Sequence, residues 1–525
     1  MSVYFGKGRS GSYSDGTRME KNYILKKGTD IAFKNHADEC VGTGRMGLAL
    51  QKEYMDQLKV VQEEIGFKHI RGHGLFSDDM AIYHEYEEDG VTKVEYNFTY
   101  LDLVMDNYMS VGIRPFLELG FMPSKLASGE QTIFYWKGNT TPPKSYDMWC
   151  DLVVATLKHL MERYGADEVV TWPIEVWNEP NLPGFWKGAD MEEYTVLFEK
   201  TFKAIKSLDK RFRIGGPAIC GVEDGKHMKF FMDFLTEHKL PIDFITRHHY
   251  TSEFPENSGH YSYIRLVELH ESMTSVERSR DIIDSYPDYK GIEMHITEFN
   301  TSYVPDAPIH DTNQNAAFTA SLLAILGDTS ESYSYWTFGD IFEEKGVPFT
   351  PFHGGFGMVA NGGIRKPTFY AFKFFKDLKG KCVLREEDAV VCRDDEGVYR
   401  GVLFNSNTDR IGRKLEMSFT ADADDTTYTL VTKTVDEHTC DPLKVWHDLG
   451  EPSSPDDEQM ELLRSSDKPF IETRLIEAGD GKARFDINVE EFGLVYFELK
   501  PVKICPDRGY DYDRVMRGEP KAQNA

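Results

Sequence analysis

The sequence has few cysteines, no long apolar run and a deficit of basic residues. Its seven cysteines are scattered over 525 residues without a Cys-x-x-Cys pair, which excludes a disulfide scaffold and disfavours a structural zinc site. No stretch approaches the roughly 20 apolar residues of a membrane span, and the first residues lack the apolar core of a signal peptide. We therefore expect a reduced, cytoplasmic protein without a membrane partner.

Basic residues are outnumbered, 60 against 87 acidic residues, for a net charge of −27. A field of that sign repels phosphate backbones, so we expect no nucleic-acid partner. The composition is 40% hydrophobic and 13% aromatic, as in an ordinary globular protein. The substrate is expected to be neutral or to be recognised by local groups.

Short β-rich runs alternate with amphipathic helical segments from about residue 33 to 340, and this alternation predicts a parallel sheet. Tyr54, Leu58, Val61 and Ile65, for example, share one helical face. A first strand ends near Val41, and seven more are predicted at 67–71, 113–119, 174–177, 213–215, 244–248, 293–298 and 332–336. Eight such units favour a (β/α)8 TIM barrel over a doubly wound sheet.

Beyond about residue 356 the pattern changes to short strands separated by charged or glycine-containing turns, which predicts a β-sandwich. We expect an N-terminal extension that packs on the sandwich, a catalytic barrel, an accessory β-sandwich and a polar tail, with bounds 1–24, 25–355, 356–505 and 506–525.

Two glutamates follow predicted barrel strands. Glu179, within Trp177-Asn-Glu-Pro-Asn181, ends the fourth strand, where barrel enzymes carry their catalytic groups. Glu298 ends the seventh, and strict alternation would place it inside the barrel on the face of Met294 and Ile296. A single strand-end glutamate is often only solvated or salt-bridged, but a facing pair is what glycoside hydrolysis requires.

Polar and aromatic side chains follow other strands. Asn178 carries both a donor and an acceptor for a sugar hydroxyl, and His73, His248, Tyr250 and Trp336 lie at strand ends of the same mouth. The competing hypothesis for the histidines is a metal site, which we disfavour because His295 and Glu298 are spaced to face opposite ways on a strand. The run Phe134–Asn139 is either an aromatic wall for sugar rings or a loop that packs its own aromatics.

The segment Gly42-Thr-Gly-Arg-Met-Gly47 matches the dinucleotide-binding pattern G-x-G-x-x-G. The next strand ends at Arg71-Gly-His73, without the acidic residue that binds a ribose diol. We therefore disfavour an oxidoreductase and expect no cofactor.

With these residues identified, the chain resembles the β-xylosidases of glycoside hydrolase family 39 from about Val41 to Phe372. The resemblance rests on long strings, namely IRGHGLFSDD (70–79), FYWKGN (134–139), TWPIEVWNEPNLPGFW (171–186), HITEFNTSY (295–303) and FHGGFG (352–357).

The resemblance implies a retaining mechanism, with Glu179 as acid/base and Glu298 as nucleophile, acting on xylo-oligosaccharides. It also implies sugar contacts from His73, Asn178, His248, Tyr250, Trp336 and Glu344, and a homotetramer.

The identity of the sugar stays open at this stage. The same family contains iduronidases, which must bind a carboxylate, and Lys137 and Arg45 are the only cations expected near the mouth. A β-glucosidase is a further alternative, as is a carbohydrate-binding barrel without turnover.

Overall fold

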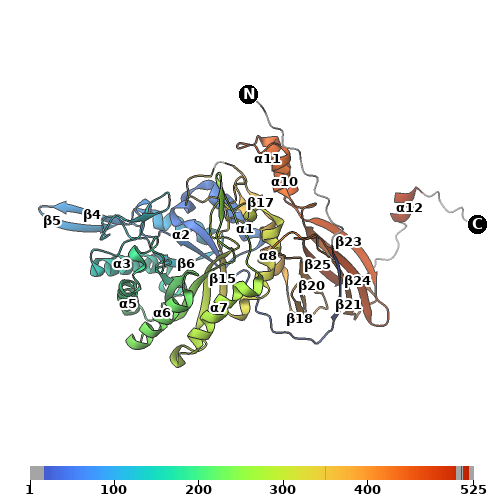
Figure 1. Cartoon of the computed structure of the whole chain (residues 1–525), viewed down its shortest axis with the longest axis horizontal. Helices are drawn as coiled ribbons and strands as arrows, with labels where there is room; N and C mark the ends of the chain where they lie inside the picture. Colours follow the sequence, from blue (N-terminus) through green and yellow to red (C-terminus); the bar gives the residue numbers. More distant parts are fainter. Residues whose placement is uncertain (1–16, 349, 504–509, 511, 519–525) are drawn as a thin grey trace, which may run out of the picture.

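The computed structural model describes residues 17–348, 350–503, 510 and 512–518. Eight parallel strands close into a barrel, each followed by a helix (Figure 1), which confirms the predicted fold class. In barrel order the strands are β2 (Cys40–Arg45), β3 (His69–His73), β6 (Arg114–Leu119), β9 (Ile174–Val176), β10 (Ile214–Ile219), β11 (Phe244–Tyr250), β14 (Glu293–Asn300) and β15 (Ser332–Tyr335).

The helices cover the outside of the barrel with their apolar faces. The predicted face of α1, which includes Tyr54, Leu58 and Val61, is fully buried. The barrel helices are α1 (Lys52–Glu64), α2 (Thr99–Ser110), α3 (Tyr146–Tyr164), α5 (Met191–Leu208), α6 (Asp224–His238), α7 (Leu269–Asp284), α8 (Asn313–Leu323) and α9 (Pro367–Asp377), with the short α4 (Ala166–Val169) after α3.

Helix α9 completes the barrel, although the boundary predicted at residue 355 separates it from the barrel. Its Phe372 ring lies 5.2 Å from the ring of Tyr335 on β15 and 6.3 Å from that of Phe299 on β14. The change from helical to strand patterning therefore comes after α9, because this last helix is needed to cover β15.

The second body is a two-sheet sandwich, whose strands from the C-terminal part of the chain are orange to red in Figure 1. One sheet has the order β18 (Lys381–Glu386), β19 (Ala389–Arg393), β20 (Tyr399–Phe404), β25 (Leu494–Pro501), β22 (Thr427–Val435) and β23 (Phe470–Glu477). The other has the order β1 (Arg18–Leu25), β21 (Lys414–Asp422) and β24 (Lys482–Val489). Alternate residues such as Leu415, Met417 and Phe419 are buried between the sheets.

Strand β1 joins the N-terminal segment to the sandwich, since it pairs in parallel with β21 from Arg18–Lys414 to Leu25–Ala421. Residues 1–16 of the predicted extension, and 506–509, 511 and 519–525 of the predicted tail, lie outside the described residues. Among the described tail residues is the helix α12 (Tyr512–Arg517).

Smaller elements extend from the two bodies. The β4–β5 hairpin projects from the barrel far from the sandwich, and α10 and α11 lie between β22 and β23 in sequence (Figure 1). Their bounds are β4 (Tyr83–Glu88), β5 (Val91–Tyr96), β7 (Thr132–Ile133), β8 (Gly138–Asn139), β12 (Glu256–Ser258), β13 (Tyr261–Tyr263), β16 (Val359–Ala360), β17 (Ile364–Arg365), α10 (Pro442–Asp448) and α11 (Asp457–Ser466). Among the described helices, none is both long enough and apolar enough to cross a membrane.

Candidate active site

A cavity of about 490 Å³ opens at the C-terminal mouth of the barrel. It brings together six of the residues singled out from the sequence, which are His73, Glu179, Tyr250, Glu298, Trp336 and Glu344. The other two, Asn178 and His248, are buried and hydrogen-bonded to groups of the site. All eight side chains therefore belong to one constellation.

The backbone around Glu179 turns sharply out of β9. Trp177 and Glu179 have φ values of 74° and 44°, in the left-handed region, which costs of order 1–3 kcal/mol per residue and persists only where packing enforces it. The Trp177 ring packs 5.0 Å from that of Trp186, and the Glu179 N–H donates to the Ala218 carbonyl at 3.0 Å. These contacts hold the Glu179 carboxyl toward the cavity.

Glu298 points into the barrel, as predicted, but strict alternation is not the reason. Met294 and Ile296 belong to the core that contains the helix residues, whereas the His295 ring lies 5.1 Å from that of Phe244 in a separate small cluster. The pairing of β14 shifts by one residue before Glu298, because Arg247 pairs with Ile296 and His248 with Glu298. This β-bulge re-aims the side chain, as bulges beside active sites do.

Two side chains donate hydrogen bonds to the Glu298 carboxylate. Arg71 donates from Nη1 to Oε1 at 2.8 Å, and the Tyr250 hydroxyl donates to Oε2 at 2.7 Å. Arg71 is completely buried and also donates to Glu175 at 2.6 Å and to Asn178 Oδ1 at 2.8 Å. Such charge-assisted bonds stabilise the negative charge of Glu298 in its apolar surroundings.

His248 connects the two catalytic candidates. Its Nδ1 shares a hydrogen bond with Glu179 Oε1 at 2.7 Å and lies 3.4 Å from Glu298 Oε2. One carboxylate oxygen of each glutamate lies within 4.8 Å of the other. Burial, reinforced by the charge of Glu298, raises the pKa of Glu179 well above its usual value. Burial and then the charge of Arg71 lower the pKa of His248, so it stays neutral.

These three side chains are also spaced as metal ligands would be. Three of the four carboxylate oxygens, however, already have hydrogen-bond partners, since Arg71 and Tyr250 bond both oxygens of Glu298 and His248 bonds one oxygen of Glu179. The arrangement is better explained by proton transfer than by cation binding, and we keep the prediction that the site works without a metal.

Aromatic rings surround His73 on the wall of the cavity. The Trp336 ring lies 4.7 Å away, the Phe134 ring stacks at 5.8 Å, and Nδ1 shares a hydrogen bond of 2.6 Å with Glu118 Oε2. Phe134, from the predicted aromatic wall, packs behind His73 and is not among the residues that line the cavity. In the part of the chain that is described, this run therefore supports the site from behind.

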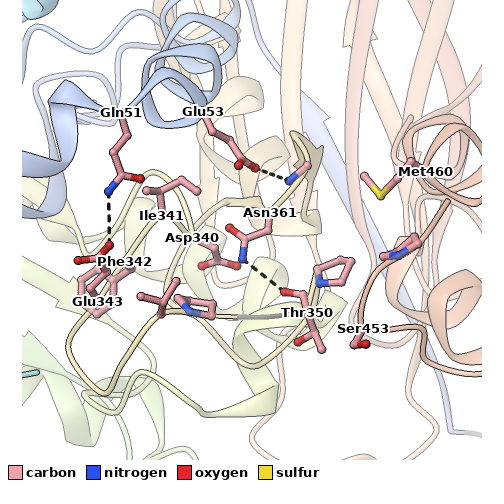
Figure 2. A pocket seen from close by; sticks show the side chains of 15 residues that line it. Gln51, Glu53, Asp340, Ile341, Phe342, Glu343, Thr350, Asn361, Ser453 and Met460 are labelled. Atoms are coloured by element: carbon pink, nitrogen blue, oxygen red, sulfur yellow. Dashed lines mark hydrogen bonds between the residues drawn. The ribbon is translucent and has the colours of Figure 1, made fainter. Parts of the chain in front are cut away.

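Glu344 reaches the cavity from the loop after β15. Its neighbour Glu343 turns the other way, bonding to Arg45 at 2.6 Å and to Gln51 at 3.4 Å (Figure 2). The Glu344 carbonyl accepts from the Tyr135 N–H at 2.8 Å. Burial and then the charge of Glu298 raise the pKa of Glu344 well above its ordinary value.

A second cavity, of about 330 Å³, is lined by residues of this loop together with Gln51, Glu53, Ser453 and Met460 (Figure 2). Its carboxylates are all partnered, for Asp340 pairs with Lys366 at 2.6 Å and Glu53 accepts from the Gly362 N–H at 3.0 Å. This cavity lacks a facing carboxyl pair, and we place the chemistry in the barrel mouth.

The glycines of the G-x-G-x-x-G segment serve packing beneath the site. A Cβ at Gly42 would lie 2.6 Å from the Trp336 ring, and one at Gly44 would lie 2.9 Å from the Phe342 ring. The strand that carries them, β2, belongs to the closed barrel. The structure thus accounts for these glycines without a bound phosphate.

Sequence reasoning missed Arg71, Glu118 and Glu175, which form the charged layer under the site. Glu175 also accepts from the Thr297 hydroxyl at 2.8 Å, and Glu118 lies 3.0 Å from Arg71 Nη2. A signal was present, because charged residues in the middle of buried strands require partners. Sequence reasoning also missed apolar residues that line the cavity, namely Val222, Phe254 and Phe356, because they stand on loops without a regular pattern.

Comparisons with known proteins agree with this geometry. The profile of glycosyl hydrolases family 39 matches residues 23–483. A β-xylosidase of Geobacillus stearothermophilus is 45% identical over 475 residues, covering 90% of this chain and 94% of that protein. One of Caldicellulosiruptor saccharolyticus is 33% identical, covering 88% and 94%. The crystal structure of a monomeric β-xylosidase from Caulobacter crescentus CB15 superposes with a TM-score of 0.84 at 30% identity, covering 92% of this chain and all of that one.

Proposed function

The chain belongs to glycosyl hydrolases family 39, and from that premise we propose that this glycoside hydrolase is a retaining, exo-acting β-D-xylosidase that removes terminal β-xylosyl residues from xylo-oligosaccharides. The xylosidase activity is supported by the relatives named β-xylosidases that share nearly the whole chain. One related structure is described as monomeric, so the predicted tetramer stays a prediction.

The separation of the two carboxyls is the observation that carries the mechanism. Retaining glycosidases hold them about 5–5.5 Å apart, whereas inverting enzymes leave roughly 6.5–9.5 Å for a water molecule. Oxygens of Glu179 and Glu298 within 4.8 Å of each other support retention.

The roles follow from the environments of the two glutamates. Glu179, whose raised pKa keeps it protonated, donates its proton to the leaving oxygen while Glu298, whose two oxygens accept hydrogen bonds from Arg71 and Tyr250, attacks the anomeric carbon. Glu179 then takes a proton from water, which attacks the glycosyl-enzyme and releases Glu298. The xylose leaves with the β configuration with which it entered.

Polar groups around the pair are placed to hold the sugar. The Nδ2 of Asn178 is buried without a hydrogen-bond partner among the described residues, while its Oδ1 is held by Arg71. A buried donor of this kind is costly unless a ligand satisfies it, and a sugar hydroxyl would do so. His73, Trp336 and Glu344 line the same cavity and complete the proposed sugar site.

The charge of the cavity favours a neutral sugar over the uronic acid of an iduronidase. Among the described residues that line it are Glu179, Glu253, Glu298 and Glu344, but no lysine or arginine. Arg45 is neutralised by Asp79 and Glu343, and Lys137 is exposed and lies outside the lining. A carboxylated sugar would find no cation among the described lining residues.

The first-formed sugar tests the proposal. The protein is mixed with an aryl β-D-xyloside, and the products are followed by proton NMR before mutarotation. We expect β-xylose. Initial α-xylose would overturn retention, hydrolysis of other aryl glycosides alone would overturn the xylosidase assignment, and no turnover of any glycoside would favour a carbohydrate-binding barrel.

A further inference from the structure

One side of the cavity mouth carries an exposed apolar rim. Phe254 is 93% exposed, Val222 53% and Tyr303 43%, and all three line the same cavity as the two catalytic glutamates. They stand on the loops after β11, β10 and β14, which are neighbours in the barrel. The three rim side chains therefore stand on adjacent loops around one cavity.

The rim loops are tied to the protein by backbone bonds. Beside Phe254, the Glu253 N–H donates to the Arg265 carbonyl at 2.9 Å, and Val267 N–H donates to the Thr251 carbonyl at 2.8 Å. Asn181, two residues after the acid, donates from Nδ2 to the Val222 carbonyl at 3.0 Å. The side chains are thus presented outward from a fixed backbone, although exposing a phenylalanine ring forfeits the free energy of burial.

The position of the rim matches where a leaving group must lie. His73 stands on β3, which is opposite β11 in the eight-stranded order, so the xylose that contacts His73 lies across the mouth from Phe254. The oxygen that Glu179 protonates leads away from this xylose. The ring attached to that oxygen then lies on the side of the acid, where Asn181 holds Val222.

We propose that Phe254, flanked by Val222 and Tyr303, forms a leaving-group subsite that stacks on the apolar C–H face of a neutral pyranose ring. This inference rests on the proposed function and deepens it. The continuity of the rim with the catalytic cavity supports a substrate ring as its occupant. The charge is also suitable for a neutral ring, since the described lining there offers Glu253 and no cation, which disfavours a uronic acid as the leaving group.

Kinetics on two substrates test the subsite. Phe254→Ala is compared with the wild type on xylobiose, which has a pyranose leaving group, and on 2,4-dinitrophenyl β-D-xyloside, whose leaving group departs before the limiting hydrolysis of the glycosyl-enzyme. We expect kcat/KM on xylobiose to fall about tenfold, which corresponds to about 1.4 kcal/mol. The kcat on the aryl substrate is expected to fall less than twofold, and Phe254→Trp is expected to restore xylobiose cleavage.

Phe470→Ala is the matched control, because Phe470 is an exposed phenylalanine on β23 of the sandwich, and both kinetic constants should remain at wild-type values. An unchanged kcat/KM of Phe254→Ala on xylobiose would overturn the subsite. So would a change of molar mass by light scattering, which would make Phe254 a subunit contact. If the wild type cleaves neither substrate, the proposed function itself fails, which is a separate result.

Discussion

Removing one hydroxyl, by Tyr250→Phe, is expected to slow the second half of the reaction. In the resting enzyme this hydroxyl donates to Glu298 Oε2 at 2.7 Å. In the proposed glycosyl-enzyme Glu298 would be an ester without charge, so the hydrogen bond would be weak there. When water releases the sugar, the negative charge returns and the bond strengthens, which makes Tyr250 most useful in the deglycosylation transition state.

The structure sets the size of the effect. Without Tyr250, Oε2 keeps only the neutral His248 Nδ1 at 3.4 Å, while Arg71 still holds Oε1 at 2.8 Å. A buried hydrogen bond to a charged group contributes about 1.5–3 kcal/mol. With tenfold for each 1.4 kcal/mol, deglycosylation should slow roughly 10- to 150-fold.

Stopped-flow measurement of dinitrophenolate release from 2,4-dinitrophenyl β-D-xyloside follows both steps. We expect Tyr250→Phe to show a burst of about one equivalent per site followed by a slow steady state. Tyr263→Phe, an exposed tyrosine on β13, serves as the control. A steady state equal to that of the wild type, or a slow reaction without a burst in a folded variant, would refute this role for Tyr250.

Three further changes separate acid, charge and stability effects. Glu179→Ala should lower kcat/KM for phenyl β-xyloside by about 10²–10⁴ but hardly affect dinitrophenyl substrates, and azide should yield β-xylosyl azide; an α-azide or no adduct would contradict the acid/base role. Because the raised pKa of Glu344 lets the folded protein hold a proton that the unfolded chain has released, stability falls as pH rises from about 4.5 through that raised value. Glu344→Gln should therefore melt above the wild type at pH 8 and lose that advantage at pH 4, and an equal difference at both values would argue against a buried protonated Glu344. Arg71→Met should lower the free energy of unfolding by about 3–5 kcal/mol in urea titrations at pH 7 and by less at pH 5, where the buried carboxyls accept protons; a loss independent of pH would mean that packing, not charge, is what Arg71 contributes.

The barrel and the proposed catalytic pair are predictable from sequence because both depend on periodic signals. Apolar spacing in segments such as Tyr54–Ile65 defines helices with one buried face, and strand–helix alternation fixes the order of the parallel strands. The carboxyl end of each strand then meets the same mouth of the barrel. Glu179 and Glu298 therefore converge without any knowledge of their exact orientation.

The sequence does not determine which way the individual side chains of a strand point. The bulge in β14 places one extra residue between Ile296 and Glu298, and the amino-acid sequence carries no mark of it. Strict alternation counted back from Glu298 therefore assigns Met294 and Ile296 to the barrel interior, although they face the helices. The predicted boundary at 355 does not anticipate the place of α9 for a related reason, since α9 follows a long loop and its contact with the barrel is seen only in the packing of Phe372 on Tyr335.

The charged layer under the site could have been predicted from the sequence, whereas the apolar rim could not. Arg71, Glu118 and Glu175 each lie within a strand of buried residues, where an unpaired charge would cost several kcal/mol. One cation and three carboxylates, counting Glu298, must therefore meet inside the barrel, and this conclusion was accessible from the strand assignments alone. Phe254 is different, because its exposure depends on where a loop ends and no energetic rule requires it. A ring that gains nothing from the fold but faces the catalytic cavity is best explained by what enters that cavity.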